Sequence, residues 1–251
     1  MTLRNPDREA VAHGHITNEP IRQKPGVPSW VLKLIMAVTG LLFALFVVGH
    51  MAGNLKLYLP AHGGEEALDE YGAFLRSMGE PLFPHEGALW IIRAVLLVAI
   101  IAHIYGAFAL TARSKASRGK FRRSNLMGGL DSFATKSMLV TGIVLLLFII
   151  FHLLDLTLGV QPIAPGDFVE GAVKANMIAT FSRWPVTIVY VIAMCFLFLH
   201  LTHGIRLAAS DLGITGAKWR QTFLILAYVI PAVVCIGNIV MPLSVALGLV
   251  S

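Results

Sequence analysis

Cysteine is almost absent from this chain of 251 residues, since only Cys195 and Cys235 occur. Two cysteines in apolar segments do not imply a disulfide framework, and an iron–sulfur cluster takes four thiolates. The chain also has no Cys-x-x-Cys-His run and no glycine-rich dinucleotide fingerprint. Covalently attached c-type haem, iron–sulfur clusters and flavin are therefore not expected on this chain.

Charged residues are missing from five long stretches, which cover residues 34–55, 94–112, 137–154, 184–205 and 221–251. The chain is 56% hydrophobic with a mean hydropathy of +0.74, beyond the range of a soluble globular domain. A helix needs about 20 apolar residues to cross the bilayer core. We therefore expect an all-α, polytopic membrane helix bundle with five transmembrane helices. Their expected bounds are 30–57, 88–113, 132–158, 184–209 and 219–248.

The two signs of charge fall in different connecting segments. Residues 113–123 carry six basic side chains and no acid, whereas residues 57–88 carry six acids against Arg76 alone. By the positive-inside rule, residues 1–29 form a cytoplasmic N-terminal tail and the C-terminus lies outside. Residues 30–251 then form one transmembrane domain in membrane lipid. Juxtamembrane lysine and arginine are ordinary topology signals, so no nucleic-acid partner is expected.

The long outer connection, residues 61–87, also has a helical pattern. Five of its apolar side chains fall on one helical face: Leu68, Tyr71, Phe74, Leu75 and Met78. This pattern predicts an amphipathic helix in the first outer loop, lying on the outer surface. Residues 167–181 show the same pattern more weakly.

Four of the expected spans each carry a histidine: His50, His103, His152 and His203. An ionisable side chain inside a membrane span is costly, so four in matching positions indicate a common role. Neutral imidazole is a good ligand for haem iron, and facing helices can bring two imidazoles together. The pattern therefore predicts two haem b groups, each held by two histidines.

Depth along the helices assigns the ligands to pairs. His50 and His152 lie in the outer portions of helices that run outward, whereas His103 and His203 lie in the inner portions of helices that run inward. Two ligands of one iron must lie at equal depth. The prediction is therefore His50 with His152 for an outer haem, and His103 with His203 for an inner haem. His200, three residues before His203, remains an alternative inner ligand.

A weak internal repeat accompanies this register. Thr39-Gly40 precedes His50 by the same interval as Thr141-Gly142 precedes His152. A duplicated two-helix unit, followed by a fifth helix, explains the match. Haem propionates need cationic or hydrogen-bonding partners, and the candidates are His200, Arg206, Lys136 and Arg93.

A non-redox interpretation stays open beside the haem interpretation. Histidines in a membrane bundle can also pack helices or relay protons. Relays usually include buried carboxylates, and the five charge-free runs contain none. A five-helix transporter or assembly protein is therefore the non-redox alternative.

In these motifs the chain resembles the cytochrome b membrane-anchor subunit of succinate dehydrogenases and fumarate reductases, of the single-chain, five-helix, dihaem type. The resemblance covers most of residues 30–248. It rests on four motifs in order: TGLLFALFVVGHM around His50, IIAHIYGA around His103, TGIVLLLFIIFH around His152 and LHLTHGIRL around His203.

The resemblance implies a role in electron transfer. The family's anchor docks a cytoplasmic flavoprotein and an iron–sulfur subunit in the bacterial cytoplasmic (inner) membrane. Electrons from succinate pass through the inner haem and then the outer haem to a quinone, which this anchor type implies to be menaquinone. The chain is then no enzyme on its own. A fumarate reductase subunit, working in the reverse direction, is the alternative.

The chain departs from some dihaem relatives at one position. Those relatives carry a glutamate near the ligand in the fourth helix, where this chain has Leu201. A transmembrane proton route through that position is therefore in doubt. We expect outer-surface residues near the outer haem to serve quinone protonation, namely Glu70, Arg76, Glu86 and Asp155. An inner quinone site, near the iron–sulfur subunit, is the rival location.

Overall fold

The computed structural model describes residues 26–118 and 130–250, without the side chains of residues 117–136. Five long helices occur in this part of the chain: α2 (Ser29–Asn54), α4 (Gly87–Arg118), α5 (Leu130–His152), α7 (Trp184–Asp211) and α8 (Ala217–Ala246). Two shorter helices, α3 (Ala67–Ser77) and α6 (Val173–Phe181), lie in the connections between them. A 3-10 turn (Leu55–Tyr58) extends α2, and a π-helical turn (Leu153–Thr157) extends α5.

The five long helices each have the length and apolar composition of a membrane span. The predicted all-α bundle with five membrane helices is therefore confirmed. α4 continues beyond the expected residue 113 to Arg118, because lysine, alanine, serine and arginine allow the helix to run on past its apolar part. α7 begins with a proline in its first turn, where the missing N–H costs nothing.

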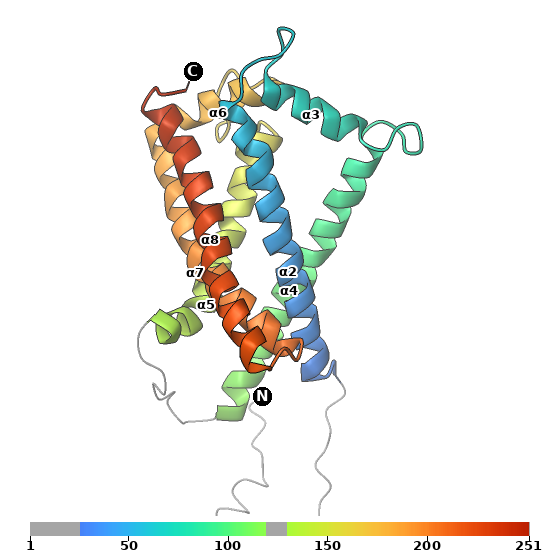
Figure 1. Ribbon diagram of the computed structural model, residues 1–251, viewed down its shortest axis with the longest axis vertical. Helices are drawn as coiled ribbons and strands as arrows, with labels where there is room; N and C mark the ends of the chain where they lie inside the picture. The colour runs from blue at the N-terminus through green and yellow to red at the C-terminus, as the bar shows by residue number, and fades with distance from the viewer. Residues whose placement is uncertain (1–25, 119–129, 251) are drawn as a thin grey trace, which may run out of the picture.

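Successive long helices run in opposite directions, and Figure 1 shows α3 and α6 at the end of the bundle where the C-terminus lies. We call this end the loop end, and the end where α2 and α8 begin the tail end. The tail predicted for residues 1–29 lies almost wholly outside the described residues. Which end faces the cytoplasm stays a prediction.

α7 is the central helix of the bundle. It packs against α8, α5 and α2, whereas α4 packs chiefly against α2. Small residues permit the close approaches: a Cβ built on Gly106 of α4 comes within 2.9 Å of Met36 Sδ of α2. Gly237 of α8 meets Met51 of α2 in the same way, at 2.6 Å. Small residues at helix crossings are typical of membrane bundles, where tight packing replaces the hydrophobic effect.

α3 and α6 lie against each other across the loop end (Figure 1). Lys174 of α6 forms an ion pair with Glu66 at 3.1 Å, and its backbone N–H donates to Asp69 of α3 at 2.8 Å. Leu68 of α3 is buried in a cluster with residues of α6, α7 and α8, while Phe74 remains exposed. The helix therefore exists where the sequence pattern predicts it, and its position on a membrane surface stays a prediction.

Candidate functional site

The loop-end pair consists of His50 near the end of α2 and His152 at the end of α5. Their ring centres lie 5.8 Å apart and their ring planes are nearly perpendicular, at 87°. A phenylalanine one helical turn earlier stacks on each ring: Phe46 on His50 and Phe148 on His152. The two copies of the repeat therefore supply equivalent ligand-and-aromatic units, which face each other.

The tail-end pair consists of His103 of α4 and His200 of α7. Their ring centres lie 6.4 Å apart, with 59° between the ring planes. The ring contact at this depth is thus made by His200, the alternative in the sequence prediction. His203 is half-buried one turn further along α7.

Two threonines of the repeat hold the tail-end pair. Thr39 Oγ1 lies 2.8 Å from His103 Nδ1, and Thr141 Oγ1 lies 3.0 Å from His200 Nδ1. A Cβ built on the glycine that follows either threonine would lie 3.5 Å from the same imidazole: Gly40 from His103, Gly142 from His200. Each copy of the repeated Thr-Gly unit therefore contacts one of these histidines, with the threonine hydroxyl bonded to the imidazole and the glycine leaving room for the ring.

The hydroxyl protons fix how these hydrogen bonds run. Each threonine has one hydroxyl hydrogen, and it goes to a backbone carbonyl: Thr39 donates to Ile35 at 2.6 Å and Thr141 to Met138 at 3.0 Å. The threonine oxygen must then accept from the histidine Nδ1–H. Both imidazoles are therefore held as the Nδ1–H tautomer, in which the Nε2 lone pair is available to a metal.

His152 is held by a longer chain of hydrogen bonds. The Tyr190 hydroxyl lies 3.2 Å from His152 Nδ1 and donates to Asp155 Oδ2 at 3.1 Å. Its oxygen therefore accepts from His152 Nδ1–H, by the same reasoning as for the threonines. Asp155 is fully buried and forms an ion pair with Arg183 at 2.6 Å. This third imidazole is also held with Nε2 available.

The spacing of both pairs suits one metal ion between two imidazoles. A bond from an imidazole nitrogen to a first-row transition metal is about 2 Å long, which places two ring centres roughly 6 Å apart across the ion. The observed 5.8 Å and 6.4 Å bracket this value. Within residues 26–118 and 130–250, no three potential metal-ligating side chains come together. Haem iron takes its other ligands from the planar macrocycle, so two imidazoles from the protein are enough to hold it. The residues present therefore fit a haem.

The two pairs lie at different depths in the bundle. Thr39, beside the tail-end pair, and His50 of the loop-end pair are eleven residues apart on α2, or about 16 Å along the helix. The same interval separates Thr141 from His152 on α5. Two sites at this separation would occupy about half of a bilayer core that is about 30 Å thick.

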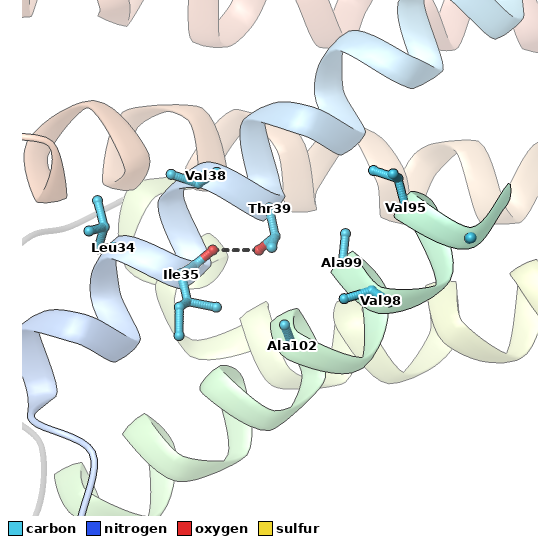
Figure 2. A pocket seen from close by; sticks show the side chains of 9 residues that line it. Leu34, Ile35, Val38, Thr39, Val95, Val98, Ala99 and Ala102 are labelled. Carbon is cyan, nitrogen blue, oxygen red and sulfur yellow. Dashed lines mark hydrogen bonds between the residues drawn. The ribbon is translucent and has the colours of Figure 1, made fainter. Parts of the chain in front are cut away.

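Apolar space adjoins the tail-end pair. Figure 2 shows a cavity between α2 and α4, with Thr39 donating to the Ile35 carbonyl at its edge. Its volume is about 610 Å³. The remaining lining is aliphatic: Leu34, Val38, Ala94, Val95, Val98, Ala99 and Ala102. Thr39 lines this cavity and is also hydrogen-bonded to His103. The cavity therefore offers apolar surface close to the histidine.

The predicted propionate partners do not gather at one place. Arg93 lies at the loop end, 3.8 Å from Glu86 and over the ring of Trp90. Arg206 lies on α7 toward the tail end and is half-buried. The side chain of Lys136 lies outside the described residues.

The four predicted quinone residues fall into separate groups. Arg76 forms an ion pair with Glu86 at 3.5 Å, between α3 and the start of α4. Glu70 is exposed on α3. Asp155 belongs instead to the buried group with Arg183 and Tyr190.

Four residues of the site were not singled out as functional by the sequence pattern. Thr39 and Thr141 carried a signal, because they mark the repeat, but the sequence does not show that they contact histidines of the neighbouring helices. Tyr190 and Arg183 carried no comparable signal. Their contacts depend on how α7 and the segment before it pack beside α5.

The fold and the site define a multi-pass membrane protein that presents paired imidazoles at two depths within its bundle. A family model for succinate dehydrogenase/fumarate reductase transmembrane subunits matches residues 115–237 of the chain. The match includes α5, α7 and most of α8, and therefore His152 and His200. No curated protein and no solved structure matches the chain.

Proposed function

We propose that the chain anchors a succinate:quinone oxidoreductase in the membrane and transfers its electrons through two b haems. The observation that carries the proposal is the pair of bis-imidazole sites, at two depths, with ring-centre distances of 5.8 Å and 6.4 Å. His50 and His152 would hold the outer haem at the loop end. His103 and His200 would hold the inner haem at the tail end.

Bound haem supplies one-electron transfer at its iron. Two imidazoles from the protein would leave that iron no open position, so the sites favour electron transfer over oxygen chemistry. The protein's part is to hold the rings: Thr39, Thr141 and Tyr190 orient three of the four imidazoles through Nδ1. The stacked phenylalanines Phe46 and Phe148 fix the ring positions at the loop end.

Succinate or fumarate chemistry would take place on partner chains. A flavoprotein subunit and an iron–sulfur subunit would dock at the tail end, on the cytoplasmic face of the bacterial inner membrane. The family description names both succinate dehydrogenase and fumarate reductase, so fumarate reduction is the second candidate function. Menaquinone remains the proposed quinone, on the resemblance alone.

The ion-paired group of Arg76, Glu86 and Arg93 supports a quinone site at the loop end. Glu86 lies between the two arginines, at 3.5 Å and 3.8 Å, where α3 meets α4. Charged groups at this depth could exchange protons between a quinone and the adjoining water. Replacing Glu86 with glutamine should then slow quinone turnover while the content of haem remains unchanged.

A difference spectrum tests the proposal directly. The purified protein, dithionite-reduced minus oxidised, should show two b-type haems per chain. Purification from its native membrane in mild detergent should bring down a flavoprotein and an iron–sulfur protein with it. A colourless protein without such partners would instead support the non-redox alternative, a transporter or assembly protein.

A further inference from the structure

The two histidine pairs differ in what holds their imidazoles. At the tail end, each Nδ1–H donates to a neutral threonine hydroxyl whose own proton goes to a backbone carbonyl. At the loop end, His152 donates to Tyr190, whose proton goes to a carboxylate. The two sites therefore differ in the group that accepts the Nδ1–H and in what that group is bonded to. Such hydrogen-bond partners tune the basicity of a metal-ligating imidazole.

We infer that Tyr190 is a positioning residue that connects the ligand His152 to the ion pair between the buried Asp155 and Arg183, and thereby lowers the reduction potential of the loop-end haem. The inference rests on the proposed function, because it assigns His152 to a haem. It assigns a role to Tyr190, Asp155 and Arg183 toward that haem, and it makes the two haem sites chemically different.

Asp155 is held as a carboxylate by three donors. Arg183 donates to Oδ1 at 2.6 Å, Tyr190 to Oδ2 at 3.1 Å, and Thr180 to Oδ1 at 3.4 Å. Asp155 is fully buried, and a buried carboxylate remains charged only when it is paired and hydrogen-bonded in this way. The charge is therefore fixed close to the Tyr190 hydroxyl.

The π-helical turn after His152 makes this contact possible. α5 ends at His152, and the wider turn of Leu153–Thr157 carries Asp155. Tyr190 of α7 contacts both His152 and Asp155. Single π-helical turns are rare and often mark functional sites. Here the turn places a ligand and a carboxylate three residues later against the same hydroxyl.

Aromatic rings hold Tyr190 in its place. Phe148, Phe151 and Phe181 pack edge-on against the Tyr190 ring, with ring centres 5.0 Å, 5.9 Å and 4.9 Å away. Tyr190 is only 6% exposed. Phe148 also stacks on His152, so one phenylalanine ring packs against both the ligand and the tyrosine. The hydroxyl therefore has little freedom to turn away from either partner.

The direction of the effect follows from charge. A hydroxyl that donates to a carboxylate becomes a better hydrogen-bond acceptor, because hydrogen bonds in a chain polarise one another. It then draws the Nδ1 proton of His152 more strongly, and the ring becomes a more basic ligand. A more basic ligand favours ferric over ferrous iron. Removing the hydroxyl should therefore raise the potential of the loop-end haem alone.

Redox titration of Tyr190→Phe in the full complex tests the inference. Phenylalanine keeps the ring among its aromatic neighbours and removes only the hydroxyl. The matched control is Tyr58→Phe, which removes a hydroxyl bonded to Ser244 at 2.9 Å, also near the loop end. The readouts are the midpoint potential of each haem, followed by absorption, and the haem content per chain.

The expected result is an upward shift of one midpoint potential in Tyr190→Phe and no shift in Tyr58→Phe. The shifted haem should be the one that disappears in His50→Ala. The double variant Asp155→Asn with Arg183→Gln removes both charges but keeps the hydrogen-bond chain, and should give a smaller upward shift. This second variant also reports on the ion pair if Tyr190→Phe retains too little haem to titrate.

Three outcomes would overturn the inference. Two haems with wild-type potentials in Tyr190→Phe would show that the hydroxyl does not act on His152. A shift confined to the other haem would show that Tyr190 acts elsewhere. Failure of the wild-type protein to bind haem at all would instead refute the proposed function, and the inference with it. The haem content of the wild type therefore distinguishes the two failures.

Discussion

Thr141 Oγ1 lies 3.0 Å from Nδ1 of His200. The first copy of the repeat makes the same contact between Thr39 and His103, at 2.8 Å. His200 is therefore the structural counterpart of His103, although the sequence alone gave His203 as the first choice. Because the threonine proton is already donated to a carbonyl, the contact also fixes which imidazole nitrogen is available to a metal.

Replacing His200 should abolish the tail-end haem. His200→Ala removes the imidazole that faces His103, so we expect one b haem per chain in the difference spectrum. His203→Ala, one turn away on the same helix, is the matched control and should retain both haems. Retention of both haems in His200→Ala, with loss of one in His203→Ala, would instead assign His203 as the partner of His103.

Replacing His50 or His152 should remove the loop-end haem and leave the other. The two rings face each other at 5.8 Å, so either variant deprives the same iron of a ligand. The remaining haem should be the tail-end haem. Its absorption and potential should therefore match those of the haem that is lost in both His103→Ala and His200→Ala. Loss of the same haem from all four variants would contradict the existence of two separate sites.

Replacing Thr141 with valine should weaken haem binding without removing a ligand. Valine has nearly the same shape but cannot accept the Nδ1–H of His200, and loss of such a contact typically lowers metal affinity about 10- to 100-fold. Titration of haem-depleted membranes with haemin measures the change.

Thr202→Val is the control for this experiment. Thr202 is a buried threonine of α7 whose hydroxyl has no hydrogen-bond partner in the structure. Its loss should leave haem affinity unchanged and cost little stability. Equal weakening in Thr141→Val and Thr202→Val would attribute the effect to general packing rather than to His200.

Replacing Arg183 alone should destabilise the protein. Arg183→Gln leaves Asp155, which is 0% exposed, without its charged partner. Because Arg183 itself is 30% exposed, the cost should lie at or below the lower end of the about 3–5 kcal/mol typical of a fully buried pair. The thermal unfolding midpoint in detergent should therefore fall. Adding Asp155→Asn should restore most of the loss, because no uncompensated charge then remains. A double variant as unstable as the single one would show that the charge is not the cause.

Much of the fold could be predicted from the sequence because it depends on local composition. The charge-free runs required five membrane helices, and the spans in the structure match them to within a few residues. The amphipathic pattern between residues 61 and 87 likewise corresponds to α3. The bounds differ where local rules compete, as at the end of α4, where polar residues continue the helix beyond its apolar part.

The site could be predicted only in part. His50, His103 and His152 stand out because ionisable groups are rare in membrane spans. Tyr190 and Arg183 do not stand out, because tyrosine is common in apolar spans and arginine is common at their ends. Asp155 was expected near a quinone at the surface, and the structure shows it fully buried beside Arg183. A side chain next to a span can turn inward or outward, and composition does not distinguish the two.

The sequence by itself determined a five-helix membrane bundle with histidines at two depths, because apolar length and the cost of buried ionisable groups act locally along each helix. Only the tertiary structure decided which imidazoles face each other, that Thr39 and Thr141 seat two of them, and that Tyr190 joins a third to the ion pair. These relations depend on the rotation of neighbouring helices and on the π-helical turn after His152. His200 and His203 lie on one helix within a single turn, and only the packing of α7 against α5 distinguishes them.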